Sequence, residues 1–119
     1  MMTFLDSIQA FDECLDQSNC QPVFVFKHST SCPISAQAYQ TVLRYASAHI
    51  GECPPIYTVK VIEYRQVSDA ITDKLAIIHK SPQLILVQRC SAVWSASHYG
   101  ISHDRITEAL NSLQERMSR

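Results

Sequence analysis

Three features that often decide a protein's class are missing from this chain of 119 residues. Its formal charge of −1 gives no basic excess for nucleic acid or an anionic membrane. Its apolar runs are far shorter than the roughly 20 residues that cross a bilayer. The segment Met1–Asp6 lacks the basic residues of a secretory signal. We therefore expect a cytoplasmic protein that binds neither nucleic acid nor membranes.

Closely spaced cysteine pairs are missing as well. The five cysteines are Cys14, Cys20, Cys32, Cys53 and Cys90. No two of them have the two-residue gap that is typical of zinc knuckles and dithiol redox motifs. An odd and irregular set is typical of free thiols in the reducing cytosol. We expect no metal site in this chain.

The apolar pattern predicts a single folded domain over residues 1–119, since 46% of the residues are apolar and 18% are charged. Apolar spacings predict helices over 3–16, 33–49, 69–79 and 103–116, capped by Thr3, Ser68 and Ser102 where a cap is visible. Strands are predicted over 22–27, 56–62, 84–87 and 92–96. The order αβαβαββα predicts an α/β fold with one mixed four-stranded sheet and helices on both faces. In this sheet the first two strands are parallel and the last two form an antiparallel hairpin.

Cys32 lies between a predicted strand and a predicted helix. Proline is favoured in the first turn of a helix, so Pro33 places Cys32 at or near the N-cap. Unpaired N–H groups and the helix dipole stabilise a thiolate there, and cysteines in such positions can titrate below about 8.5. The pattern predicts a reactive thiol, and the alternative is a cysteine that is merely packed.

Ser35 occupies the position where a dithiol motif would have its second cysteine. Because serine cannot form a disulfide, Cys32 cannot be resolved within this motif, and the remaining chemistry is monothiol exchange. Ser35 could donate a hydrogen bond to the thiolate. The alternative is an ordinary exposed serine on the helix surface.

Three segments resemble the YtxJ group of bacillithiol-linked redox proteins, the monothiol bacilliredoxins, which have a thioredoxin-like fold. They are Lys27–Ser35 with its Cys-Pro-Ile-Ser core, Ser81-Pro82-Gln83, and Val93–His98. The likeness extends from about Val23 to Leu110. It departs at Gln88-Arg89-Cys90, where the group has a polar Asp-Gly turn.

The resemblance implies an enzyme that removes bacillithiol from mixed disulfides on S-thiolated client proteins. Cys32 would be the nucleophile, with bacillithiol as co-substrate and no tightly bound cofactor. The residues expected to contact substrate are His28, Ser31, Pro33, Ser81 and Pro82. Pro82 would follow a cis peptide bond and face the sulfur, and the Ser81 backbone could pair with an incoming chain. His28 could instead be a strand-end histidine satisfied by the backbone.

Two other functions remain open from the sequence. A monothiol protein of this fold could carry an iron–sulfur cluster between two copies, or the chain could be a non-catalytic interaction domain. A resolving role for Cys90 would require the fold to bring it close to Cys32.

Overall fold

A computed structural model describes residues 2–118. Its elements are, in order, β1 (Met2–Phe4), α1 (Ile8–Gln17), β2 (Val23–His28), α2 (Pro33–Ala48), β3 (Ile56–Lys60), α3 (Arg65–Leu75), β4 (Gln83–Gln88), β5 (Ser91–Ser97), the 3₁₀ turn η1 (His98–Gly100) and α4 (His103–Met117). No helix in this part of the chain has the length and apolar character that spanning a membrane requires.

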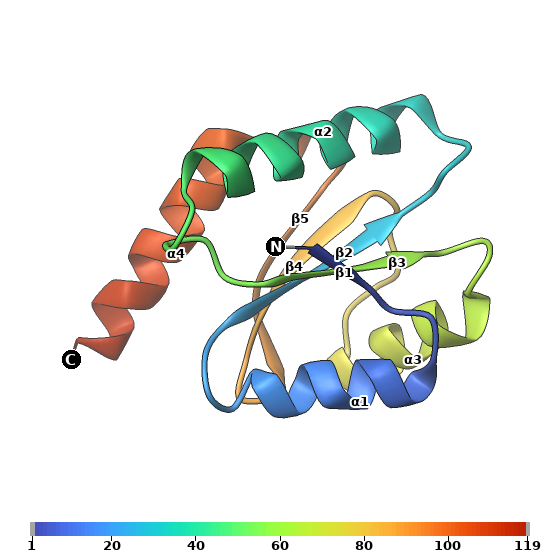
Figure 1. Cartoon of the computed structure of the whole chain (residues 1–119), viewed down its shortest axis with the longest axis horizontal. Coiled ribbons are helices and arrows are strands. Elements are labelled where there is room, and N and C mark those ends of the chain that lie inside the picture. Colours follow the sequence, from blue (N-terminus) through green and yellow to red (C-terminus); the bar gives the residue numbers. More distant parts are fainter. Residues whose placement is uncertain (1, 119) are drawn as a thin grey trace.

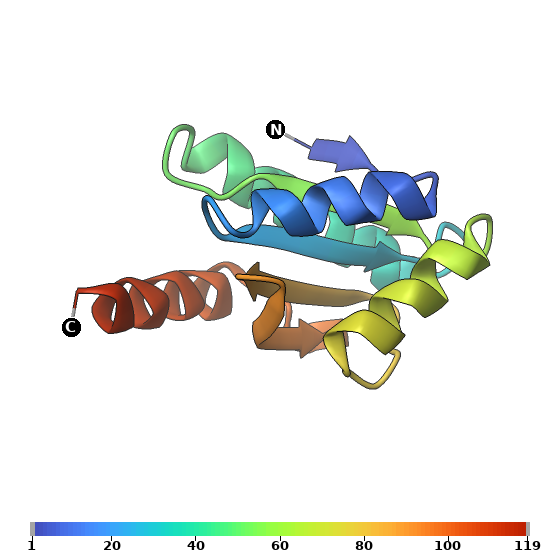
Figure 2. The ribbon, with the colours of Figure 1, turned by 90° about the horizontal axis from the view of Figure 1, so that it is seen from below.

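Within residues 2–118 the strands form one five-stranded sheet in the order β1-β3-β2-β4-β5. The pairs β1–β3 and β3–β2 are parallel, while β2–β4 and β4–β5 are antiparallel. Helices α2 and α4 lie on one face, and α1 and α3 lie on the other (Figures 1 and 2). The predicted mixed sheet with helices on both faces is confirmed, but the predicted number of four strands is wrong.

The missed strand is β1, where the first helix was predicted to begin. Residues 2–4 pair in parallel with residues 56–58, and α1 starts only at Ile8. Its N-cap is Ser7, whose hydroxyl accepts the Ala10 N–H at 3.0 Å, so Thr3 is not the cap. The apolar spacing placed the start of the helix too early because it includes Leu5, which is buried but lies ahead of the helix. Ile8, the first residue of the helix, is 43% exposed.

The third helix begins and ends four residues earlier than predicted. It occupies Arg65–Leu75 rather than 69–79, and Tyr64 is its N-cap. Ser68 is buried within the helix and does not cap it, and Ile78 lies beyond the helix with 79% of its surface exposed. The helix ends at Leu75, and its C-cap residue Ala76 has a left-handed φ of 51°, so the apolar residues that follow are not part of the helical stripe.

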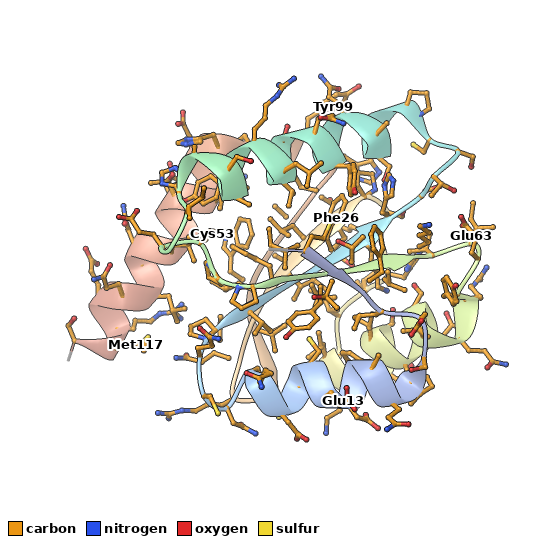
Figure 3. All side chains as sticks on the ribbon, viewed as in Figure 1. Glu13, Phe26, Cys53, Glu63, Tyr99 and Met117 are labelled. Carbon is orange, nitrogen blue, oxygen red and sulfur yellow. The ribbon has the colours of Figure 1, made fainter. Side chains whose placement is uncertain are left out.

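Strand β2 lies in the interior because both its faces are covered. Val23 and Val25 pack with residues of α1 and α3, while Phe24 and Phe26 pack with residues of α2 and α4. Figure 3 shows Phe26 between the sheet and α2. This double cover explains the continuous apolar run, which is typical of a central strand.

The hairpin between β4 and β5 turns through Arg89 and Cys90, whose φ angles are 51° and 62°. Two successive positive φ values usually call for glycine or asparagine. Here the end of α1 holds the turn, because Ser18 accepts the Arg89 N–H at its carbonyl (2.8 Å) and the Cys90 N–H at its hydroxyl (2.9 Å). The turn that departs from the expected Asp-Gly is therefore stabilised by tertiary contacts.

Candidate active site

Cys32 is the N-cap residue of α2, with Pro33 in the first helical position. Its backbone is extended, with φ −106° and ψ 122°, and no side chain caps the helix. Its carbonyl accepts the Ala36 N–H at 3.0 Å, which begins the helical pattern. The thiol is free and half-buried. A sulfur at this position faces unpaired N–H groups and the positive end of a 16-residue helix.

Ser35 is fully buried, so the alternative of an exposed helix serine is wrong. Its hydroxyl oxygen accepts the Ser29 N–H at 2.9 Å and lies 2.7 Å from Nδ1 of His28. These bonds join the first turn of α2 to the end of β2. The four-residue loop that ends at Cys32 is therefore fixed at both of its ends.

His28 is buried and stacks on Tyr39, with ring centroids 4.8 Å apart and an interplanar angle of 12°. Burial lowers the pKa of His28, Glu63 raises it, and Lys60 lowers it. A neutral imidazole can accept at Nδ1, and in that tautomer the Ser35 hydroxyl donates to His28. The ring is thus satisfied by a side chain rather than by the backbone partner that the alternative interpretation assumed.

The loop carrying Cys32 has a further anchor at its exposed residue Thr30. The Thr30 hydroxyl donates to Oε2 of Glu63 at 3.0 Å. Figure 3 shows Glu63 at the end of the molecule where α2 begins. Ser31 and Pro33 flank Cys32 and are exposed, so both are free to contact a molecule that approaches the sulfur.

The segment Ser81-Pro82 lies at the same end of the sheet. Its peptide bond is cis. Lys27 pairs with Gln83 across the antiparallel strands β2 and β4, so the next position along each strand places Pro82 beside His28. The Pro82 carbonyl accepts the His98 N–H at 3.1 Å, which ties η1 to this segment. The Ser81 hydroxyl is buried and has no partner in the part of the chain that the structure describes.

A recess of about 140 Å³ separates η1 from the first turns of α2. Its walls include Ile34, Thr41, His98 and Tyr99. Tyr99 is 76% exposed and lies beside α2 in Figure 3. The surface next to Cys32 therefore has both a hollow and an exposed aromatic ring.

Lys27 is a buried residue that the sequence analysis did not single out. Its Nζ donates to the Thr72 hydroxyl at 2.6 Å and lies 3.0 Å from Nδ1 of His79. Burial lowers the pKa of Lys27 to about 8, against a smaller opposing effect of Asp69. Lys27 thus connects β2 to α3 through Thr72, and to the segment leading to Pro82 through His79. Its signal in the sequence is a charged residue at an inward position of an apolar strand.

The structure does not bring Cys90 to Cys32. The Cys90 thiol lies against the end of α1, 3.4 Å from the Leu15 carbonyl oxygen. This is the end where β2 begins, whereas Cys32 lies beyond the end of β2. Six residues of strand separate the two ends by about 20 Å, so Cys90 is not placed to resolve a disulfide at Cys32.

Comparison with known proteins places these features in a family. The model of the family described as monothiol bacilliredoxin BrxC matches residues 3–106. A solved structure described as a candidate oxidoreductase with a thioredoxin fold is 31% identical, covers 91% of this chain and 92% of its own, and has a TM-score of 0.81. Fasciola hepatica thioredoxin is 14% identical over 93% of this chain and 98% of its own, with a TM-score of 0.72. Thioredoxin O2 of Arabidopsis thaliana is 16% identical over 94% and 93%, also with a TM-score of 0.72. These two thioredoxins share the fold.

Proposed function

The chain belongs to the monothiol bacilliredoxin BrxC family of the thioredoxin-like fold, and on this basis we propose that it removes bacillithiol from mixed disulfides on client proteins. The family and fold support a thiol oxidoreductase whose partners are thiols or protein disulfides. The observation that carries the finer proposal is a free, half-buried thiol at a helix N-cap whose neighbour in the dithiol position is a buried serine.

The first step is a thiol–disulfide exchange at Cys32. Its thiolate attacks the bacillithiol sulfur of the mixed disulfide, the bond between that sulfur and the client sulfur breaks, and the client leaves as a thiolate. Bacillithiol then remains bound to Cys32 through a disulfide. The client sulfur has gained the electron pair, and the Cys32 sulfur has been oxidised to the same extent.

The second step needs an external thiol, because Ser35 cannot supply a second sulfur. A second low-molecular thiol attacks the bacillithiol sulfur on Cys32, forms a small-molecule disulfide, and releases the Cys32 thiolate. We propose that Ser31, Pro33, Ser81, Pro82 and His28 form the substrate site, in which Pro82 and His28 are buried. Within it, His28 acts through its bond to Ser35, which sets the position of the loop. The five free cysteines support action in a reducing compartment such as the cytoplasm.

The proposal is tested by incubating the reduced protein with a client peptide that carries bacillithiol on a single cysteine. Intact mass spectrometry should show the adduct moving to Cys32 and the peptide emerging reduced. Cys32→Ala should abolish the transfer, and Cys20→Ala, which removes an exposed thiol, should leave it unchanged. Equal behaviour of the wild-type protein and Cys32→Ala would refute the assignment.

A further inference from the structure

A polar cavity of about 260 Å³ lies at the outer edge of the sheet, beside the Pro82 segment. Its lining includes Lys80, Gln83, Ser95, Ser97, Gly100 and Arg105. Two cations and two hydroxyls therefore surround it, and no carboxylate is part of its lining.

The two cations are available to a ligand. Lys80 and Arg105 are exposed, and neither takes part in an ion pair among residues 2–118. The Arg105 guanidinium lies over Gly100, with Nη1 3.7 Å from the point where a Cβ would stand. This is an ordinary van der Waals distance, so the guanidinium lies directly beside the backbone of Gly100.

Gln83 adds an acceptor that the described part of the chain does not use. Its side chain is 3% exposed, and its Nε2 donates to the Ile78 carbonyl at 3.2 Å. The remaining oxygen, Oε1, is buried and has no hydrogen-bond partner within residues 2–118. A buried acceptor without a partner is costly, and a ligand hydroxyl or N–H group would satisfy it.

The sheet topology places this cavity at the same end of the sheet as Cys32. Strands β2 and β5 run in the same direction with β4 antiparallel between them, so the ends of β2 and β5 and the start of β4 share one edge. Neighbouring strands lie about 4.8 Å apart, so the path from the end of β2 past Pro82 to the end of β5 is about 10 Å. An extended molecule of about tripeptide size has a comparable length of about 10 Å.

We infer that this cavity binds the carboxylates of the low-molecular thiol while its sulfur is joined to Cys32, with Lys80 and Arg105 as the anion-binding groups and Gln83 accepting from a ligand hydroxyl or N–H. The inference rests on the proposed function and adds the part of the substrate that the protein recognises. It predicts that a small anionic thiol is transferred to Cys32 faster than a neutral one.

The test measures the second-order rate constant of adduct transfer to Cys32 for one peptide carrying either bacillithiol or 2-mercaptoethanol, which has no carboxylate. The double variant Lys80→Gln with Arg105→Gln should slow transfer of bacillithiol by about twofold to thirtyfold, the range expected for two exposed charge pairs. Transfer of 2-mercaptoethanol should be unchanged, and high salt should reduce the difference between the adducts.

The matched control is the double variant Lys74→Gln with Arg116→Gln, which removes the same net charge at exposed positions outside the cavity. It should retain the wild-type preference for bacillithiol. Equal slowing of both adducts by the Lys80 and Arg105 variant would show that the cations bind the client peptide, and would overturn the inference. An equal effect of the control variant would do the same.

A binding measurement separates this inference from the proposed function. Cys32→Ala protein is titrated with S-methyl bacillithiol, and the backbone amide NMR signals are followed. Signals of Ser97 and Gly100 should shift in Cys32→Ala and should not shift once Lys80 and Arg105 are also replaced. If the wild-type protein transfers no adduct at all, the proposed function fails, whereas unshifted signals at these residues overturn the cavity assignment.

Discussion

Replacing Lys27 by methionine tests whether burial of the Lys27 amine lowers its pKa and destabilises the folded state. The Lys27 side chain is fully buried, and burial lowers its pKa from 10.5 to about 8. Methionine has a similar length and no charge, so it fills the same space without the free-energy cost of dehydrating a charged ammonium group. The substitution also removes the bonds of Nζ to Thr72 and His79.

The magnitude follows from the two pKa values. At pH 7 both the folded and the unfolded chain carry the proton, and the folded state is destabilised by about 3 kcal/mol at about 1.4 kcal/mol per pKa unit. Between pH 8 and 10.5 the unfolded chain still binds the proton and the folded chain does not. Stability therefore rises with pH in this window, because the unfolded state holds more protons.

The expected signature is a pH-dependent difference between the two proteins. Relative to the wild type, Lys27→Met should lose about 2 kcal/mol of stability between pH 7 and pH 9.5, because only the wild type gains as its lysine is neutralised. At pH 7 the loss of two hydrogen bonds, about 1 kcal/mol each, offsets most of the benefit of removing the charge. The variant should then be about as stable as the wild type, or slightly more stable.

The assay is urea unfolding of both proteins at the two pH values under reducing conditions. Burial raises the pKa of the Cys14 thiol to about 12, which weakens the fold above pH 9, but this contribution is present in both proteins and cancels in the difference. Lys74→Met, at an exposed lysine, is the matched control, and its pH dependence is subtracted from that of Lys27→Met. If the free energy of unfolding of Lys27→Met differs from that of the wild type by the same amount at both pH values, burial does not lower the pKa of Lys27, and the reasoning fails.

Three further predictions concern the loop and the second thiol. Ser35→Ala should cost about 1–3 kcal/mol in urea unfolding, because the Ser29 N–H and His28 lose their buried partner. Because burial lowers the pKa of His28, the unfolded chain binds a proton below pH 6.5 that the folded chain resists. The wild type should therefore lose more stability than His28→Asn between pH 7 and pH 5, as read from the urea midpoints. Cys90→Ala should leave adduct transfer to Cys32 unchanged in the mass assay, and a slower transfer would contradict the separation of the two thiols.

The position of Cys32 could be predicted from the sequence because its determinants are local. An apolar strand followed by proline is enough to place the cysteine at the start of a helix, and α2 begins at Pro33. Strand β1 could not be found in this way. Three residues are too few to show a period of two, and their pairing partners are residues 56–58, far along the chain.

The hydrogen-bond partners of the buried polar groups could not be predicted from the sequence either. The alternation Val23, Val25, Lys27 places the lysine inward, so its burial could have been predicted from the strand period. Its contacts with Thr72 and His79 could not, because these residues follow 45 and 52 positions later. The same holds for Ser35, since its burial depends on how the helix meets the strand.

The geometry gives the monothiol assignment a basis that is independent of the motif. Cys20, Cys53 and Cys90 lie at the end of the molecule where β2 and β3 begin, because Cys20 and Cys53 lie three positions before the first residues of these strands and Cys90 contacts the end of α1. Cys32 lies beyond the opposite end of β2, about 20 Å away at 3.3 Å per residue. Cys14 is buried between α1 and the sheet. No other cysteine among residues 2–118 is therefore placed to reach a disulfide on Cys32 while the fold is intact, so in the proposed reaction the regenerating thiol would come from outside the chain.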